Sequence, residues 1–269
     1  MALLRCDFFS EVLALSTSMT VILPQETTAQ IGMTGRDSGG DPPVLYLLHG
    51  LSDDDTSWLR RTSVERYAAA LGLAVVMPQV HRSFYTDEVH GSRYWTFLSE
   101  ELPALVSRFF RVAQDRKDTF VAGLSMGGYG AVKWALREPE RFAAAASMSG
   151  ALDLVALQEI VELRDDVDDR VFGGRSVAGT PEDLFWLIDQ LDAAGAPALS
   201  VSCGTEDPLV ESNRQFVSAL RAKGIAVDSN FGPGAHEWGY WDREIERLLG
   251  WLPLKTTAPE TIGTAGQAG

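Results

Sequence analysis

The chain is poor in the residues that stabilise small secreted domains and in the long apolar runs of membrane proteins. It has two cysteines among 269 residues, too few for a disulfide framework, and Cys203 lies in an apolar run typical of a buried strand. We therefore expect no bridge between Cys6 and Cys203 and a reducing, cytoplasmic location. No apolar run reaches the roughly 18 residues of a membrane span. Asp7 and Glu11 interrupt the apolar residues at the start, so we expect no secretory leader there.

Positive charge is also scarce, with 23 lysines and arginines against 37 aspartates and glutamates and a formal net charge of −14. Such a chain is repelled by phosphate backbones and anionic lipids, so we expect neither a nucleic-acid nor a membrane partner. The 45% hydrophobic and 22% charged residues are typical of a globular protein. A chain of this length can bury roughly 75% of its unfolded surface. The sequence leaves the oligomeric state open, a homo-oligomer included.

Short apolar runs alternate with longer amphipathic stretches, which indicates an α/β fold. The apolar runs predict parallel strands that are buried on both faces, at 44–50, 73–78, 119–125, 142–150 and 197–204. Residues 19–24 predict an earlier, antiparallel strand. Apolar residues recur at intervals of three and four in the candidate helices, at 63–71, 96–110 and 126–137. We therefore expect a mostly parallel central sheet with helices on both faces.

Three stretches differ from this alternation. Residues 25–43 are rich in Gly, Thr and Pro and predict a surface loop. Residues 153–183 carry charges, glycines and short helical pieces, which fits either a small cap-like insertion or a solvated excursion without substrate contact. Residues 255–269 have the composition of a disordered tail. Nothing divides the rest into two cores, so we expect one domain over 1–254.

Small residues crowd around one serine. The segment VAGLSMGGYGA, residues 121–131, contains four glycines, although glycine inside a helix or strand costs roughly 0.5–1 kcal/mol relative to alanine. Its G-x-S-x-G pattern is centred on Ser125 and lies between a predicted strand and a predicted helix, the context of a nucleophile elbow. Small residues at 123 and 127 would let strand and helix pack closely around a strained serine. The pattern predicts Ser125 as a nucleophile; a glycine-rich turn without chemistry is the alternative.

A serine hydroxyl becomes a good nucleophile only beside a base. In chains with a nucleophile elbow the order is serine, acid, histidine. His236 is the one histidine after Ser125, in a glycine-rich loop between a candidate strand and the final helix. His81 and His90 lie in a loop before the serine. We therefore predict His236 as the base.

Asp207 is the predicted acid that orients the imidazole of His236. It follows the apolar run 197–204, at the strand end where open α/β sheets gather functional loops. Glu206 is its nearest competitor. Pro208 resembles the first residue of a helix, so helix capping is the alternative role for Asp207.

The tetrahedral intermediate of acyl transfer also needs two hydrogen-bond donors. The backbone amide of Met126, directly after the nucleophile, is one candidate. The amide of Leu51 is the other, because Gly50 allows a close turn after the strand 44–50. His49 is then expected to order this loop rather than to act as a second base.

These residues, together with the segments LLHGLSDDDTSW, VVMPQVHRSFYTD, YWTFLSEELP, GLSMGGYGA, GTEDPL and HEWGYW, carry a resemblance over about 8–252. They resemble the tributyrin esterase branch of the esterase D and S-formylglutathione hydrolase-like family. The resemblance implies an α/β-hydrolase fold and hydrolysis of short acyl esters without cofactor or metal. It implies a triad of Ser125, Asp207 and His236, with oxyanion donors at Leu51 and Met126.

The branches of this family differ in substrate, which includes short-chain glycerides, acetylated sugars, feruloyl esters and S-formylglutathione. His49 before Gly50 departs from the formylglutathione branch, which usually has serine there, and argues against a glutathione thioester. The segment 83–87, SFYTD, matches the family and is expected to be a hydrogen-bonded structural loop. Tryptophans are candidates for the wall of an acyl pocket, although tryptophan is more often core: Trp58, Trp95, Trp186, Trp238 and Trp241.

The sequence thus predicts a serine carboxylesterase that works through an acyl-enzyme on a small acyl ester. An acyltransferase, an acetyl or feruloyl sugar esterase and an S-formylglutathione hydrolase would use the same triad. A binding protein with a catalytically silent hydrolase fold is the non-enzymatic alternative.

Overall fold

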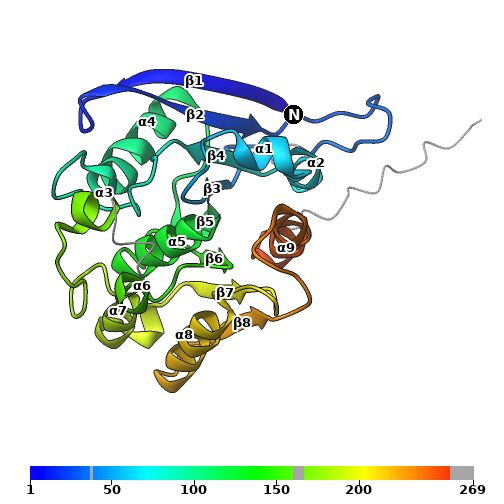
Figure 1. Cartoon of the computed structure of the whole chain (residues 1–269). Coiled ribbons are helices and arrows are strands. Elements are labelled where there is room, and N and C mark those ends of the chain that lie inside the picture. The colour runs from blue at the N-terminus through cyan, green and yellow to red at the C-terminus, as the bar shows by residue number, and fades with distance from the viewer. Residues whose placement is uncertain (37–38, 160–166, 255–269) are drawn as a thin grey trace, which may run out of the picture.

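The computed structural model describes residues 1–36, 39–159 and 167–254. These residues form a sheet in the order β1-β2-β4-β3-β5-β6-β7-β8 (Figure 1). The strands are β1 (Ala2–Ser10), β2 (Leu15–Leu23), β3 (Val44–Leu48), β4 (Ala74–Pro78), β5 (Thr119–Leu124), β6 (Ala144–Met148), β7 (Ala198–Ser202) and β8 (Val227–Asn230). β1 pairs antiparallel with β2, and β2 with β4. All later neighbours are parallel, which confirms the predicted sheet.

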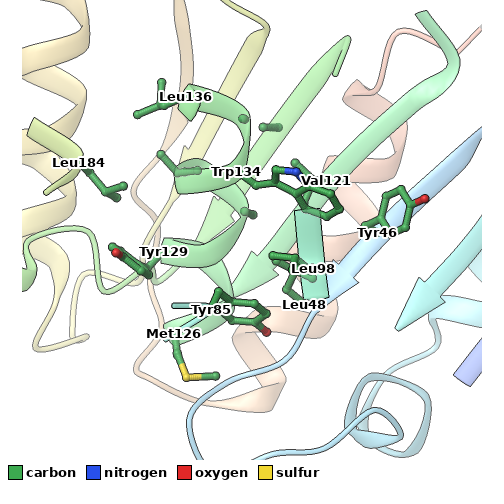
Figure 2. Close-up of a cluster of buried hydrophobic side chains, with 14 of the residues drawn as sticks. Tyr46, Leu48, Tyr85, Leu98, Val121, Met126, Tyr129, Trp134, Leu136 and Leu184 are labelled. Carbon is green, nitrogen blue, oxygen red and sulfur yellow. The ribbon is translucent and has the colours of Figure 1, made fainter. Parts of the chain in front are cut away.

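Helices cover both faces of the sheet, as predicted (Figure 1). One face carries α4 (Leu102–Phe109), α5 (Met126–Arg137), α7 (Leu184–Gln190) and α8 (Val210–Ala222). The other carries α1 (Ser57–Arg61), α2 (Val64–Ala69) and α9 (Trp238–Trp251). Alternate residues of one strand feed the two cores: Tyr46 and Leu48 face α5, whereas Leu45 and Leu47 face α9. Figure 2 shows the first core, in which Tyr46 and Trp134 lie close together.

The strand β1 was not expected. Its sequence alternates exposed and half-buried residues because one side faces water, so it contains no continuous apolar run. It pairs with β2 over nine residues, from Ala2 with Leu23 to Ser10 with Leu15. β2 is also longer than the strand predicted at 19–24. The chain thus begins in the sheet, at the edge opposite β8.

Several helix boundaries differ from the predictions. The predicted helix 96–110 consists of α3 (Tyr94–Thr96), a π-helical turn η1 (Phe97–Glu101) and α4. The prediction that Pro208 begins a helix is wrong, because α8 starts at Val210. Residues 204–210 instead form two successive turns, in which Asp207 N–H bonds to Gly204 O and Val210 N–H to Asp207 O. Two 3₁₀ helices also lie in the described part of the chain, η2 (Arg116–Asp118) and η5 (Ala193–Gly195).

The insertion at 153–183 contains α6 (Leu154–Glu159) and η4 (Asp168–Phe172). Backbone hydrogen bonds join its second part to the preceding loop, from Val89 N–H to Val171 O at 3.0 Å and from His90 N–H to Arg170 O at 2.9 Å. The predicted tail at 255–269 lies outside the described residues. The predicted loop 25–43 carries one isolated bridge, Thr27 with Gly35. None of the helices described is both long and apolar enough to cross a membrane.

Candidate active site

Ser125 stands at a sharp turn between β5 and α5. Its backbone has φ 53° and ψ −118°, a region that residues with a side chain rarely occupy. Its N–H donates to Met148 O at 3.0 Å, and its carbonyl accepts from Tyr129 N–H and Ala151 N–H, each at 3.1 Å. Neighbouring elements on both sides therefore hold the strained residue in place.

Two glycines permit this turn. A Cβ at Gly123 would lie 2.3 Å from the backbone of Gly127, and a Cβ at Gly127 would lie 2.4 Å from Leu48 O. Such distances are far inside van der Waals contact, so a side chain at Gly123 would push β5 away from α5, and one at Gly127 would push α5 away from β3. The small residues around the serine are explained by this close packing.

The three predicted triad residues meet at the ends of β5, β7 and β8. His236 Nε2 lies 3.0 Å from Ser125 Oγ, and His236 Nδ1 lies 2.8 Å from Asp207 Oδ2. Asp207 is 2% exposed, whereas Ser125 is half-buried and His236 is exposed. An ionised carboxylate can only accept, so Nδ1 carries a hydrogen and Nε2 presents its lone pair to the serine hydroxyl.

The two carboxylate oxygens of Asp207 have different partners, and the helix-capping alternative is wrong, because Leu209 is the N-cap of α8 and no side chain caps that helix. Oδ2 accepts from His236, and Oδ1 accepts from Leu209 N–H at 2.9 Å in the turn before α8. Burial alone would raise the pKa of Asp207, but hydrogen bonds from His236 and Leu209 N–H outweigh it and lower the pKa below its usual value. Asp207 is therefore the ionised partner. Glu206 instead accepts from Gly234 N–H and Thr205.

An aromatic cluster supports the imidazole. Trp241 meets the His236 ring edge-on at 4.9 Å, Trp238 meets Trp241 at 5.2 Å, and Trp58 meets Trp238 at 5.5 Å. Trp58 is 1% exposed and its N–H donates to Leu48 O, so it offers little surface to a ligand.

The other two candidate tryptophans belong to the core on the α5 face. Trp95 lies under the Arg137 guanidinium at 3.9 Å, and Trp186 is half-buried in α7. Neither has a ring contact with His236 among those of the described residues. The acyl-pocket role of the five tryptophans stays a prediction.

The two predicted oxyanion donors flank the serine. Met126 is the first residue of α5, where a helix leaves its N–H groups without an intrahelical acceptor. Leu51 follows Gly50 in the turn after β3, and a Cβ on Gly50 would lie 3.8 Å from Ser125 Cβ. A pocket of about 390 Å³ opens beside this turn, with a lining of Leu51, Ser52, Asp53, His81, Arg82, Tyr94 and Arg170.

A buried ion pair in the neighbourhood was not predicted. Lys133 on α5 is fully buried, and its Nζ donates to Thr86 Oγ1 at 2.8 Å and to Glu182 at the end of the insertion. Glu182 also accepts from Tyr129 OH at 3.1 Å and pairs with Arg137 at 3.4 Å. The segment 83–87 was the available sequence signal, but the partners of Thr86, Lys133 and Glu182, lie 47 and 96 residues further along the chain. The network joins the helix of Ser125 to the insertion.

Other polar candidates lie outside the triad. His81 packs edge-on against Tyr94, and both cysteines are free thiols, as expected. Within the described ranges, no three His, Cys, Asp or Glu side chains gather as metal ligands would.

Comparison with known proteins agrees with this geometry. The sequence model of the putative esterase family matches residues 10–252. The acetyl esterase of Caldicellulosiruptor saccharolyticus is 29% identical over 265 residues, which cover 94% of this chain and 98% of that protein.

Two solved structures from Staphylococcus aureus are similar along nearly their whole length. The substrate-bound fluorophosphonate-binding serine hydrolase FphF has a TM-score of 0.85 at 33% identity, with 94% of this chain and 99% of the other covered. The S-formylglutathione hydrolase FrmB has a TM-score of 0.82 at 34% identity, with 94% and 98% covered. The chain therefore belongs to the esterase family and is a serine hydrolase with the α/β-hydrolase fold.

Proposed function

We propose that Ser125, His236 and Asp207 are the catalytic triad of a serine carboxylesterase for short-chain acyl esters. The observation that carries this proposal is the pair of contacts at His236, 3.0 Å to Ser125 Oγ and 2.8 Å to Asp207 Oδ2. The family match supports the reaction class.

In acylation, Ser125 Oγ attacks the ester carbonyl carbon while His236 Nε2 takes the hydroxyl proton. The negative oxygen of the tetrahedral intermediate accepts hydrogen bonds from Leu51 N–H and Met126 N–H. The bond to the alcohol oxygen then breaks, and His236 returns the proton to the departing alcohol. Asp207 keeps the imidazole in the required tautomer and stabilises its charged form.

Deacylation repeats the sequence with water. Water loses a proton to His236 and attacks the acyl carbon, and the bond to Ser125 Oγ breaks as His236 reprotonates that oxygen. The products are a carboxylic acid and free enzyme. An alcohol in place of water would give acyl transfer, so product analysis with alcohol acceptors distinguishes the two outcomes.

The first test compares hydrolysis of p-nitrophenyl acetate and butyrate by wild type, Ser125→Ala and His236→Ala. Both variants should lose about four to six orders of magnitude in kcat, as in other serine hydrolases. Ser107→Ala and His90→Ala make the same changes outside the triad and should keep wild-type rates. A folded Ser125→Ala variant with a near wild-type rate refutes the proposal.

The substrate is proposed only as a class. Relatives carry the names acetyl esterase, S-formylglutathione hydrolase and ferulic acid esterase, and the pocket beside Leu51 would take part of the ester. A panel of acyl lengths, acetylated sugars, feruloyl esters and S-formylglutathione ranks these classes by kcat/KM.

We further propose a single domain over 1–254, with the insertion at 153–183 as a small cap, and a cytoplasmic location. The two free thiols support that location. Homo-oligomer formation stays a prediction, which light scattering on the purified protein tests.

A further inference from the structure

His49 is buried beside the nucleophile but takes no part in the proposed proton transfers. It follows β3 directly and is 1% exposed. The backbone N–H of Val80 donates to its Nε2 at 3.1 Å. A backbone amide can only donate, so Nε2 carries a lone pair and the ring hydrogen is on Nδ1. Nδ1 lies 2.8 Å from Gly50 O and therefore donates to it.

The ring is held in this neutral form. Burial lowers the pKa of His49, and it outweighs the Gly50 carbonyl and the carboxylates of Asp53 and Asp54, which act in the opposite direction. Tyr85 is the other titratable group in contact, and its hydroxyl donates to His49 O at 2.8 Å. The Nδ1–H donor is thus present at neutral pH.

The acceptor of this hydrogen bond is the carbonyl of the peptide that contains Leu51 N–H. Gly50 O also accepts from Asp53 N–H at 3.2 Å, so two donors hold that oxygen. A trans peptide is planar, with its C=O and N–H on opposite sides, and the described residues contain no cis peptide. Fixing Gly50 O on the His49 side therefore directs Leu51 N–H the opposite way.

Gly50 makes such a restraint necessary. A Cβ at this position would lie 2.7 Å from a Leu124 side-chain carbon and 2.9 Å from Asp53 Oδ2, so any other residue would have to displace these two side chains. Glycine also accepts most backbone dihedrals, which makes rotation of the peptide between 50 and 51 inexpensive. The same turn abuts Ser125, so a rotated peptide would replace an N–H donor near the nucleophile by a carbonyl oxygen.

We infer that His49 is a positioning residue, which fixes Leu51 N–H as an oxyanion donor by hydrogen-bonding the carbonyl of the same peptide. The inference rests on the proposed function. Leu51 N–H matters most when the carbonyl oxygen of the substrate becomes negative, so loss of the restraint should lower kcat more than it changes KM.

The decisive comparison is His49→Leu against His49→Asn. Leucine fills the space without a donor, whereas the Nδ2 amide of asparagine can donate from the position of Nδ1. Removal of one oxyanion donor costs roughly 100- to 1000-fold in kcat, and a misaligned donor should cost about 10- to 100-fold. We expect this loss in His49→Leu, with KM for p-nitrophenyl butyrate within about threefold, and recovery of most of it in His49→Asn.

Two further readouts separate alignment from general damage. The inhibition constant of a trifluoromethyl ketone, which binds serine as a charged tetrahedral adduct, should rise in His49→Leu by the same factor as kcat falls. Tyr85→Phe removes the hydrogen bond to His49 O but leaves the Gly50 carbonyl restrained, so it should lower stability without lowering kcat. If His49→Leu fails to fold, His49→Gln, whose amide donor lies one bond further out, replaces it.

Unchanged kcat in folded His49→Leu would overturn the inference. So would equal losses in the leucine and asparagine variants, or a loss in Tyr85→Phe as large as in His49→Leu. Failure of the proposed function looks different, because wild-type hydrolysis would then persist in Ser125→Ala.

Discussion

Replacing Glu182 by glutamine tests how the fold tolerates a buried lysine beside the active site. Lys133 is fully buried, and its charged Nζ is paired with Glu182, whose side chain is 19% exposed. Burial, only partly offset by Glu182, lowers the pKa of Lys133 from 10.5 to about 8. At about 1.4 kcal/mol per pKa unit, keeping this charge costs the folded protein about 3–4 kcal/mol at pH 7.

Without the Glu182 carboxylate, Lys133 can become neutral by losing its proton. A neutral Lys133 in the folded protein costs about 5 kcal/mol at pH 7 relative to a protonated lysine in the unfolded chain. The reason is that pH 7 lies about 3.5 units below the ordinary lysine pKa. Glu182→Gln should therefore destabilise by at most about 1 kcal/mol at pH 7, because pH 7 lies about one unit below the folded pKa of about 8. At pH 9 Lys133 is largely neutral in both proteins, so the difference should shrink towards zero.

The sign follows from proton binding. The folded pKa of Lys133 is below its unfolded value, so between about pH 8 and 10.5 the unfolded chain binds more protons and this group stabilises the fold as pH rises. Urea unfolding at pH 7 and pH 9, followed by tryptophan fluorescence, measures the free energy of unfolding. Glu211→Gln is the matched control, because it breaks an exposed pair with Arg214 and should change little at either pH. An equal loss at both pH values in Glu182→Gln would refute proton release by Lys133.

Three further predictions concern the triad, the elbow and the buried thiol. Asp207→Asn should lower kcat about 10⁴-fold, because an amide can stabilise the wrong tautomer of His236; steady-state kinetics measure this, and a loss below tenfold contradicts it. Gly127→Ala should destabilise by about 1–3 kcal/mol, because its Cβ would lie 2.4 Å from Leu48 O; unchanged urea unfolding would show that the elbow can relax. Burial raises the pKa of Cys203 to about 12, so iodoacetamide at pH 8 should modify this thiol only after unfolding. Mass spectrometry of the native protein after labelling checks this, and labels on both thiols would contradict it.

The sequence was sufficient for the features that local pattern determines. The elbow at Ser125 was predicted because its signals lie within a few residues, an apolar strand before and small residues on both sides. His236 followed from the order of residues along the chain and the scarcity of histidine. The fold class followed from the alternation of apolar and amphipathic segments, and the sheet topology and the similar solved structures confirm it.

Features that depend on distant partners were beyond that reasoning. The role of Lys133 needs Glu182, 49 residues further along the chain, and the tautomer of His49 depends on Val80, 31 residues away. β1 was missed because its exposed side breaks the apolar run. The helix start predicted at Pro208 was wrong because proline fits a turn before α8 as well as the first position of a helix.

The sheet order separates the two halves of the proposed chemistry. The acid and base follow β7 and β8, on one side of β5, whereas the turn with Leu51 follows β3, on the other side. The residues proposed to transfer protons and the proposed oxyanion donor Leu51 thus lie on opposite sides of β5. They meet only at the elbow of Ser125. Exposed pocket residues that follow β3 and β4, such as Ser52 and Arg82, can therefore be varied in laboratory evolution to alter ester preference while the triad and the Leu51 peptide are left intact.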